Sequence, residues 1–244
     1  MFSLLRKEIN SFLGSVIGYV VIVVFLAISG LFAWVLPGTD YNIIASGYAT
    51  LDSLFILAPW VFMFLIPAIT MRSFAEENKT GTIELLLTKP FTDLQIVASK
   101  YFAGIILVLF ALVPTFVYYG VVNFLASPVG NLDHGGIRGS YIGLFFLGSA
   151  YVSIGIFSSS ISNNQIISFI IAVLITFVFH VGFDFLSNIG FSEGLNYVLS
   201  QLGMNAHYSS LSRGVIDTRD AVYFISLTML FLASARFVLE KRKW

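Results

Sequence analysis

The sequence predicts an all-α membrane protein with six transmembrane helices. Of the 244 residues, 57% are hydrophobic and only 11% are charged, whereas soluble domains contain about 25% charged residues. Apolar stretches of about 20 residues, the length that crosses a bilayer as a helix, recur along the whole chain. The length suits one compact bundle, so we expect a single polytopic transmembrane domain over residues 1–244.

The six spans are expected where apolar residues run without interruption by charge. They are Val16–Leu36, Ser53–Thr70, Tyr101–Leu125, Tyr141–Ile161, Ile166–Phe185 and Ala221–Leu239. The last span carries the weakest signal because its charge-free run stops at Arg236, whose long side chain can reach the interface.

A separate helix is predicted ahead of the first span, over residues 1–14. Its apolar residues recur at helical spacing while polar residues fall on the opposite face, a pattern typical of a helix that lies flat in an interface. The apolar set is Phe2, Leu5, Ile9, Phe12, Leu13 and Val16, and the polar set is Arg6, Lys7, Asn10 and Ser11. We therefore expect an elbow helix in the inner interface; a long first helix that protrudes is the alternative.

Basic residues are distributed unevenly, and this asymmetry predicts orientation. If both termini face the cytoplasm, only Arg138, Arg213 and Arg219 lie outside. The inner set is then Arg6, Lys7, Arg72, Lys79, Lys89, Lys100, Arg236, Lys241, Arg242 and Lys243. We therefore expect a multi-pass protein with cytoplasmic termini and a cytoplasmic loop over residues 71–100.

This loop carries the signals of a short isolated helix. Gly81 frees the backbone, Thr82 is expected to cap the sequence IELLL, and Pro90 stops it. A second start signal follows, with Thr92 as cap and Gln95 three residues later. The loop is thus predicted to hold a short helix between two breaks.

The short helix is expected to expose apolar side chains to a binding partner. Ile83, Leu86 and Leu87 would form the docking surface, with Leu85 beside them. Glu76, Glu77 and Lys79 are expected to form a solvated turn, and Glu84 lies favourably in the first helical turn. The alternative is that the apolar residues fold back onto the bundle.

The loop between the fifth and sixth spans, residues 186–220, is expected to form short helices at the outer interface. One of them would begin after Ser192 and end at Gly203. In the fourth span, small residues favour close packing against neighbouring helices. They are Gly143, Gly148, Ser149, Ser153, Gly155 and Ser158.

Several functions are disfavoured by what the sequence lacks. It contains no phosphate-binding loop, no cysteine and no net charge, so we expect no nucleotide hydrolysis by this chain and no nucleic-acid partner. The three histidines do not form a metal-site motif. We expect no metal and no cofactor bound by this chain.

Two catalytic alternatives involve His180. It could pair with Asp184 one helical turn later, but Asp184 is expected near the outer headgroups, which argues against a proton relay. An intramembrane serine protease could use a serine of the sequence GIFSSSIS, residues 155–162. Those serines lie near the inner end of the fourth span, at a depth far from His180, so this function is disfavoured.

The sequence EENKTGTIELLLTKPFTDLQIVASKYFAG resembles the signature of type-2 ABC transporter permeases, the ABC-2 class. The matching residues are Glu76, Glu77, Gly81, Thr82, Glu84, Leu85, Leu86, Pro90 and Lys100. The sequences FSSSISNNQIISF and HYSSLSRGVIDTRDAVYF resemble further motifs of that family. Within the family, the chain is most similar to the gliding-motility permease subunit, and it also resembles the permease of nitrous oxide reductase maturation clusters.

This resemblance implies a coupling helix in the loop between the second and third spans, and a cytoplasmic ABC ATP-binding subunit that docks there and holds ATP and Mg. It also implies a second permease copy or a homologous membrane subunit, a location in the bacterial inner membrane and, usually, export. The gliding-motility branch implies an auxiliary membrane protein with a large external domain. An ATPase-driven mechanical element without substrate flux is the alternative that the motif leaves open.

Overall fold

A computed structural model describes residues 2–37, 39, 41–87, 90–189, 192–215 and 217–241. Every regular element in these residues is helical. The first half contains α1 (Phe2–Leu13), α2 (Val16–Gly30), the π-helix η1 (Leu31–Val35), α3 (Ile43–Ser46), α4 (Asp52–Thr70), α5 (Arg72–Thr80), α6 (Thr82–Leu87), α7 (Asp93–Leu112), the 3-10 helix η2 (Val113–Thr115) and α8 (Phe116–Leu125). The second half contains α9 (His134–Ile161), α10 (Gln165–Phe177), the π-helix η3 (Val178–Gly182), α11 (Phe183–Ser187), α12 (Glu193–Leu202), α13 (Met204–Ser212) and α14 (Thr218–Lys241).

Six of the described helical segments are long and apolar enough to span a membrane, which confirms the predicted number. They are Val16–Val35, Asp52–Thr80, Asp93–Leu125, His134–Ile161, Gln165–Ser187 and Thr218–Lys241. The third, fourth and sixth begin several residues before the predicted spans, because a helix continues through polar residues at its ends whereas hydropathy does not. The capping box of Thr92 and Gln95 forms as predicted and starts α7 at Asp93.

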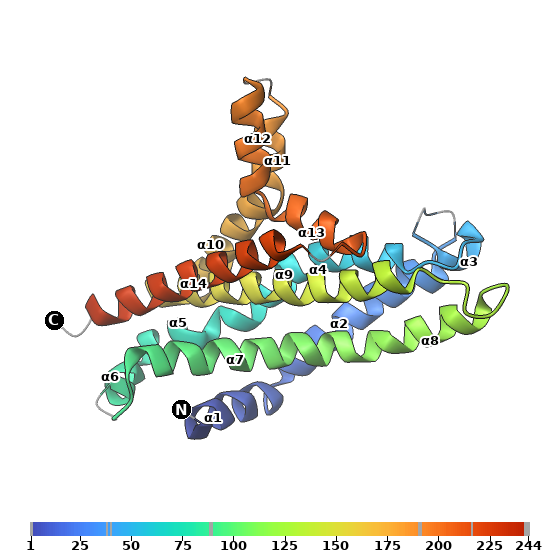
Figure 1. Cartoon of the computed structure of the whole chain (residues 1–244). Coiled ribbons are helices and arrows are strands. Elements are labelled where there is room, and N and C mark those ends of the chain that lie inside the picture. Colours follow the sequence, from blue (N-terminus) through green and yellow to red (C-terminus); the bar gives the residue numbers. More distant parts are fainter. Residues whose placement is uncertain are drawn as a thin grey trace.

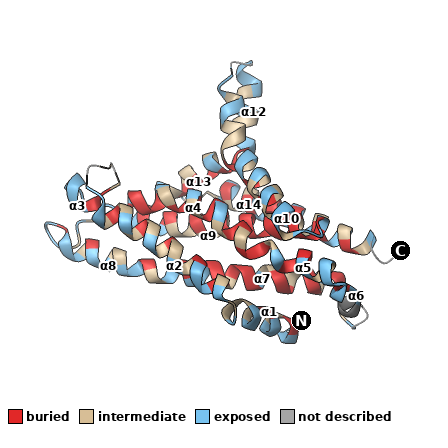
Figure 2. Cartoon of the chain, turned by 180° about the vertical axis from the view of Figure 1, so that it is seen from behind, coloured by how far each residue is buried: buried red, intermediate tan, exposed pale blue. Residues whose placement is uncertain are grey.

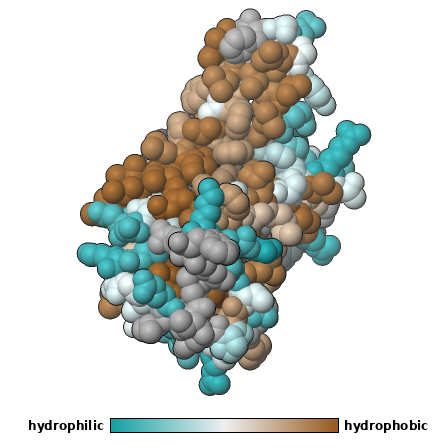
Figure 3. Space-filling model, turned by 90° about the vertical axis from the view of Figure 1, so that its left-hand side faces the viewer, coloured by the Kyte–Doolittle hydropathy of each residue, from teal (hydrophilic) through white to brown (hydrophobic). Residues whose placement is uncertain are grey.

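The spans form one bundle with two distinct ends (Figure 1). Helices α1 and α6 and the end of α14 gather at one end, which we call the terminal end. Helix α3 and the connection from α8 to α9 lie at the far end. Hydrophilic side chains surround the terminal end (Figure 3), so polar groups there flank the apolar bundle.

Helix α9 forms the centre of the bundle and contacts α4, α7, α10, α13 and α14; its buried residues dominate the core in Figure 2. The small residues predicted to allow close packing do so. A Cβ added at Gly155 would overlap the Thr70 hydroxyl and lie 2.8 Å from Thr70 Cβ, and one at Gly148 would lie 2.9 Å from Val108. Glycine therefore lets the backbone of α9 approach α4 and α7.

Helices α11 and α12 project sideways from the bundle as an arm (Figures 1 and 2). The helix over Glu193–Leu202 forms as predicted, and its expected position at the outer interface stays a prediction. The arm leaves partway along α9 and α14, where the π-helix η3 interrupts the fifth span, and π-helical turns commonly redirect helices. None of the arm's described residues from Phe183 to Ser187 or from Glu193 to Leu202 is buried.

Candidate functional site

The loop between the second and third spans continues the second span as α5, turns, and forms α6. Gly81 makes the turn with φ of +70°, a left-handed conformation that glycine adopts at little cost. Thr82 was predicted to cap α6, but α6 begins at Thr82 itself. The turn at Gly81 is tight enough that Thr82 is already helical, and its hydroxyl lies 2.9 Å from that of Thr80.

Helix α6 exposes less apolar surface than predicted. The side chain of Ile83 was expected to be exposed, yet it is only 6% exposed and belongs to the main hydrophobic core. A helix of six residues is not stable alone, so α6 depends on its packing against the bundle for its stability. Thr82, Glu84 and Pro90 are exposed. Helix α6 extends through Leu85, Leu86 and Leu87, but their side chains, like Thr88 and Lys89, lie outside the described residues.

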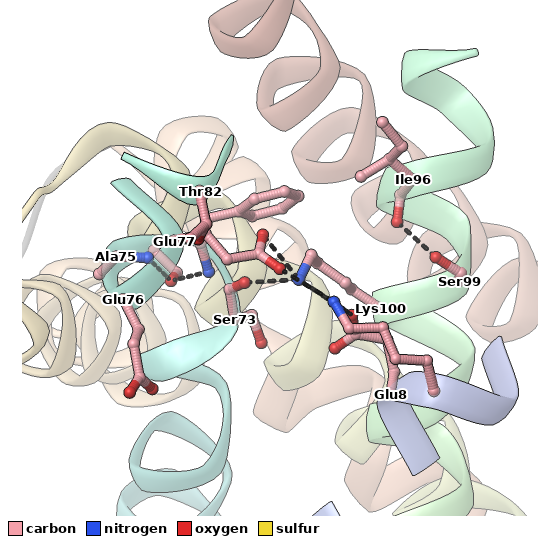
Figure 4. Close-up of polar contacts among 12 residues, drawn as sticks. Glu8, Ser73, Ala75, Glu76, Glu77, Thr82, Ile96, Ser99 and Lys100 are labelled. Carbon is pink, nitrogen blue, oxygen red and sulfur yellow. Dashed lines mark hydrogen bonds and ion pairs between the residues drawn. The ribbon is translucent and has the colours of Figure 1, made fainter. Parts of the chain in front are cut away.

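The ammonium group of Lys100 lies in a buried polar cluster that joins three helices (Figure 4). Its Nζ lies 3.0 Å from Oε2 of Glu77 on α5 and 3.3 Å from Oε1 of Glu8 on α1. It also donates a hydrogen bond of 2.6 Å to the backbone carbonyl of Ser73. The Lys100 side chain is only 1% exposed. We call Glu8, Ser73, Glu77 and Lys100 the lysine cluster.

The lysine cluster holds one ammonium group between two carboxylates, and Nζ of Lys7 lies 3.7 Å from Oε1 of each carboxylate. An ammonium group has three donors, and three oxygen atoms surround that of Lys100. The ring of Phe74 lies 4.9 Å from the same nitrogen, at a distance typical of a cation–π contact. Removing one member of a buried ion pair leaves an uncompensated charge, which is strongly destabilising. The cluster therefore fastens α1, α5 and α7 together.

The acidic pair of the loop divides into two environments. Glu77 was predicted to lie in a solvated turn, but its side chain is 17% exposed and faces Lys100. Glu76 is exposed and points away from the cluster (Figure 4), in agreement with a solvated position. Successive residues on a helix point in different directions, so only one of the two carboxylates faces the bundle.

Sequence reasoning missed Glu8 as a site residue. Its position one turn after Leu4 places it on the side of α1 that packs on the bundle, and both residues are buried. A carboxylate on the apolar side of an amphipathic helix was the available signal, because a buried charge needs a partner. Lys100 had been identified only through the resemblance, without its partners.

A serine of the second motif fixes the start of α5. The hydroxyl of Ser159 on α9 accepts hydrogen bonds from the backbone N–H groups of Phe74 and Ala75, at 2.8 and 3.0 Å. It donates one to the Met71 carbonyl at 3.0 Å. Nearby, the Asn78 amide donates to the Ser162 carbonyl at 3.1 Å. The C-terminal end of α9, at the terminal end of the bundle, therefore also holds α5.

The third motif joins α13 to α14. Nδ1 of His207 lies 2.7 Å from Oδ1 of Asp220, and Nε2 lies 2.9 Å from the Gln201 carbonyl. The ring of His207 stacks on that of Tyr223 with centroids 3.9 Å apart. Both polar atoms of the imidazole are therefore engaged in packing these helices, as expected for a structural histidine.

The residues of the disfavoured catalytic sites are not brought together. His180 packs edge-on against Trp60 and Tyr151, while the Asp184 carboxylate accepts a hydrogen bond of 2.8 Å from Asn205. The possible His180–Asp184 pair does not form among the contacts described, and the π-helix η3, which contains His180, changes the usual one-turn relationship. The hydroxyl of Ser158 donates to the Ile154 carbonyl of its own helix, and that of Ser159 fixes α5.

No cluster that could hold a metal is found among the described residues: these contain no group of three or more histidine or acidic residues placed to bind an ion. What the site offers instead is mechanical. Helix α5, at the terminal end, is fastened to α1 and α7 by the lysine cluster and to α9 by Ser159.

Comparison with known proteins identifies the family of the chain. No curated protein matches the chain. The family model of the ABC-2 family transporter proteins matches residues 41–212, which include α5, α6, the lysine cluster apart from Glu8, and the serine motif of α9. This match covers well over half of the sequence, and the chain belongs to the ABC-2 family of transporter proteins.

Proposed function

We propose that this chain is the membrane-spanning permease subunit of an ATP-driven exporter in the bacterial inner membrane, with both termini in the cytoplasm. A separate ABC ATP-binding subunit would bind ATP and Mg and would dock at the terminal end. The observation that carries this proposal, together with family membership, is the attachment of α5 to α1, α7 and α9 through Lys100 and Ser159, with Ile83 of α6 buried in the core.

The mechanism we propose is that α5 and α6 act as a rigid lever. ATP binding would close the partner subunits and displace α6. Helix α5 continues the second span with one intervening residue, Met71, so a displacement would pass directly into α4. The ion pairs of Lys100 would carry it into α7 and α1, because a packed, fully paired cluster resists separation.

The docking surface we propose is the exposed side of α5 and α6. Glu76, Gly81, Thr82 and Glu84 are exposed there, and charged groups of this kind orient a partner more than they add affinity. Leu85, Leu86, Leu87 and Pro90 complete the surface we propose. Ile83 and Glu77, which the sequence suggested as docking residues, would instead hold the lever to the bundle.

The test is the substitution Glu84→Lys, which reverses one exposed charge without touching the core. The matched control is Arg138→Glu, which reverses a charge at an exposed position near the start of α9, at the far end of the bundle. We expect Glu84→Lys to reduce the amount of ATP-binding subunit that co-purifies with the chain by about tenfold, which corresponds to a loss of about 1.4 kcal/mol in binding free energy. The stimulation of ATP hydrolysis in that subunit by the permease should fall by a similar factor. The control should match the unmodified chain. Normal assembly and coupling in Glu84→Lys would show that α6 is not the docking helix.

Three finer proposals complete this function. A second permease copy would pack beside the first, and the exposed apolar residues of the arm offer a surface for it. The gliding-motility subtype and its auxiliary membrane protein rest on the resemblance in the sequence alone. A purely mechanical role would be distinguished by substrate flux in vesicles, since a mechanical element would hydrolyse ATP through its partner without moving solute.

A further inference from the structure

A largely apolar groove runs along the outside of the bundle between α7, α9 and α14. Its volume is about 650 Å³, within the usual range of small-molecule sites. The lining includes Val97 and Tyr101 of α7, Phe145 of α9, and Phe224 and Leu232 of α14. Among the described residues that line it, Arg236 alone is charged.

The groove begins at the terminal end and stops near the middle of the bundle. It extends on α7 from Leu94 to Ile105 and on the antiparallel α14 from Arg236 to Phe224. At 1.5 Å per residue, each stretch is about 17 Å long. The hydrocarbon of a bilayer is about 30 Å thick, so the groove is about as long as one leaflet is deep.

The length of the groove and the position of Arg236 favour an acyl chain over a transmembrane helix as the occupant. A spanning helix of another chain would need a surface across the full hydrocarbon thickness, which this groove does not provide. An acyl chain of the nearer leaflet needs half of that thickness. Arg236 lies at the end of the groove nearest the terminal end, where headgroups of the nearer leaflet would lie, and Ile105 and Phe224 line the opposite end.

Arg236 retains hydrogen-bonding capacity for a headgroup. Its Nε and one Nη2 hydrogen are directed at Oε1 of Glu240, at 2.8 and 2.7 Å. A guanidinium has five N–H donors, so three remain, and the side chain is 49% exposed. Guanidinium groups bind phosphate oxygens in a fork geometry, and Glu240 holds this one at the mouth of the groove.

We propose that this groove binds one phospholipid of the leaflet at the terminal end, with an acyl chain between α7 and α14 and its phosphate on Arg236. The site is independent of the docking surface on α6. It would place a resident lipid against α7, the helix that Lys100 joins to the lever.

The probe is phosphatidylglycerol that carries a photoactivatable diazirine on one acyl chain, incorporated into phosphatidylcholine vesicles with the purified full-length chain. After irradiation, cross-linked residues are mapped by mass spectrometry. We expect cross-links to concentrate on groove residues such as Ile225 and Met229, relative to Ile170 and Leu174, which are similarly exposed on α10. Excess unlabelled phosphatidylglycerol should remove the groove cross-links and leave the others.

Two substitutions test the assignment of the headgroup and of the chain. Arg236→Gln should reduce groove cross-linking by about tenfold, as expected for lost charge-assisted hydrogen bonds, whereas Lys241→Gln, a neighbouring exposed charge, should not. Ala98→Trp should block the groove from α7. If that variant does not fold, the competition experiment and Arg236→Gln still decide the matter.

Two outcomes would overturn the proposal. If groove residues are cross-linked no more than equally exposed residues of α10, and if excess unlabelled phosphatidylglycerol does not reduce these cross-links, the groove contacts only ordinary surrounding lipid. Labelling of the groove by the phosphatidylglycerol probe that is equal in the unmodified chain and in Arg236→Gln would refute the headgroup contact.

Discussion

Lys100 on α7 and Glu77 on α5 form an ion pair of 3.0 Å within the protein, between residues 23 positions apart in the chain. The pair matters because it converts a loop into part of the bundle. With Glu8 and the Ser73 carbonyl, it leaves α5 fixed at its bundle side while Glu76 and Glu84 stay exposed. A segment of this kind can receive a force on one side and transmit it on the other.

Removing the charge of Lys100 should destabilise the protein strongly. Lys100→Met leaves the carboxylates of Glu8 and Glu77 without their buried partner, at a cost of about 3–5 kcal/mol in the free energy of unfolding. Thermal unfolding in detergent, followed by tryptophan fluorescence, measures the change. Lys79→Met, at an exposed position on the same loop, is the control. Equal stability of the two variants would mean that the cluster does not hold these helices.

Ser159→Ala should loosen the start of α5. The substitution removes the acceptor of the Phe74 and Ala75 N–H groups, and lost caps of this kind cost about 0.5–2 kcal/mol. Ser158→Ala is a close control because its hydroxyl bonds only to the Ile154 carbonyl of its own helix in the contacts described. We expect faster amide hydrogen exchange over α5 in Ser159→Ala alone. Unchanged exchange would exclude this cap.

The sequence predicted the parts of the fold that depend on local composition. Hydropathy located all six spans, and the capping residues located the start of α7. It could not predict which side of α6 packs inward, because Ile83 and Leu86 are equally apolar and only the position of the neighbouring helices decides. For the same reason it found Lys100 by resemblance but not its partner Glu8, which lies 92 positions away.

The arm was difficult to predict for a different reason. Its short helix between Ser192 and Gly203 was visible in the capping pattern, but its direction depends on the π-helix Val178–Gly182. Nothing in the local sequence distinguishes that turn from ordinary helix. The same turn contains His180, whose ring packs against Trp60 and Tyr151, so this irregularity also affects the neighbourhood of His180.

Gly155→Ala should disturb the packing of α9 on α4. An added Cβ would overlap the side chain of Thr70, and overpacking in a tight core costs about 1–3 kcal/mol. Gly120→Ala on α8 is the control, since its Cβ would meet open space, and alanine there should be neutral or stabilising by up to about 1 kcal/mol. The thermal unfolding midpoints of the two variants compare these effects. A Gly155→Ala variant as stable as Gly120→Ala would contradict the close approach.

Single cysteines can test the orientation because the chain contains none of its own. Thr80→Cys places a thiol at the terminal end, and Asn131→Cys places one at the far end; both positions are exposed. In intact cells stripped of their outer envelope, a membrane-impermeant maleimide should label Asn131→Cys. It should label Thr80→Cys only after permeabilisation. The reverse pattern would place the termini and the proposed docking surface outside the cell.

A second copy of the chain should be detectable at the arm. Val198 on α12 is 56% exposed, and an arm that projects from a bundle with apolar residues uncovered is a common feature of interaction surfaces. In membranes, Val198→Cys should form dimers with a short bis-maleimide linker, because a symmetric interface brings equivalent residues near one another. Phe124→Cys, at an exposed position on α8 near the far end, should remain monomeric. Dimers from both variants would indicate random collision, and dimers from Phe124→Cys alone would move the interface from the arm to α8.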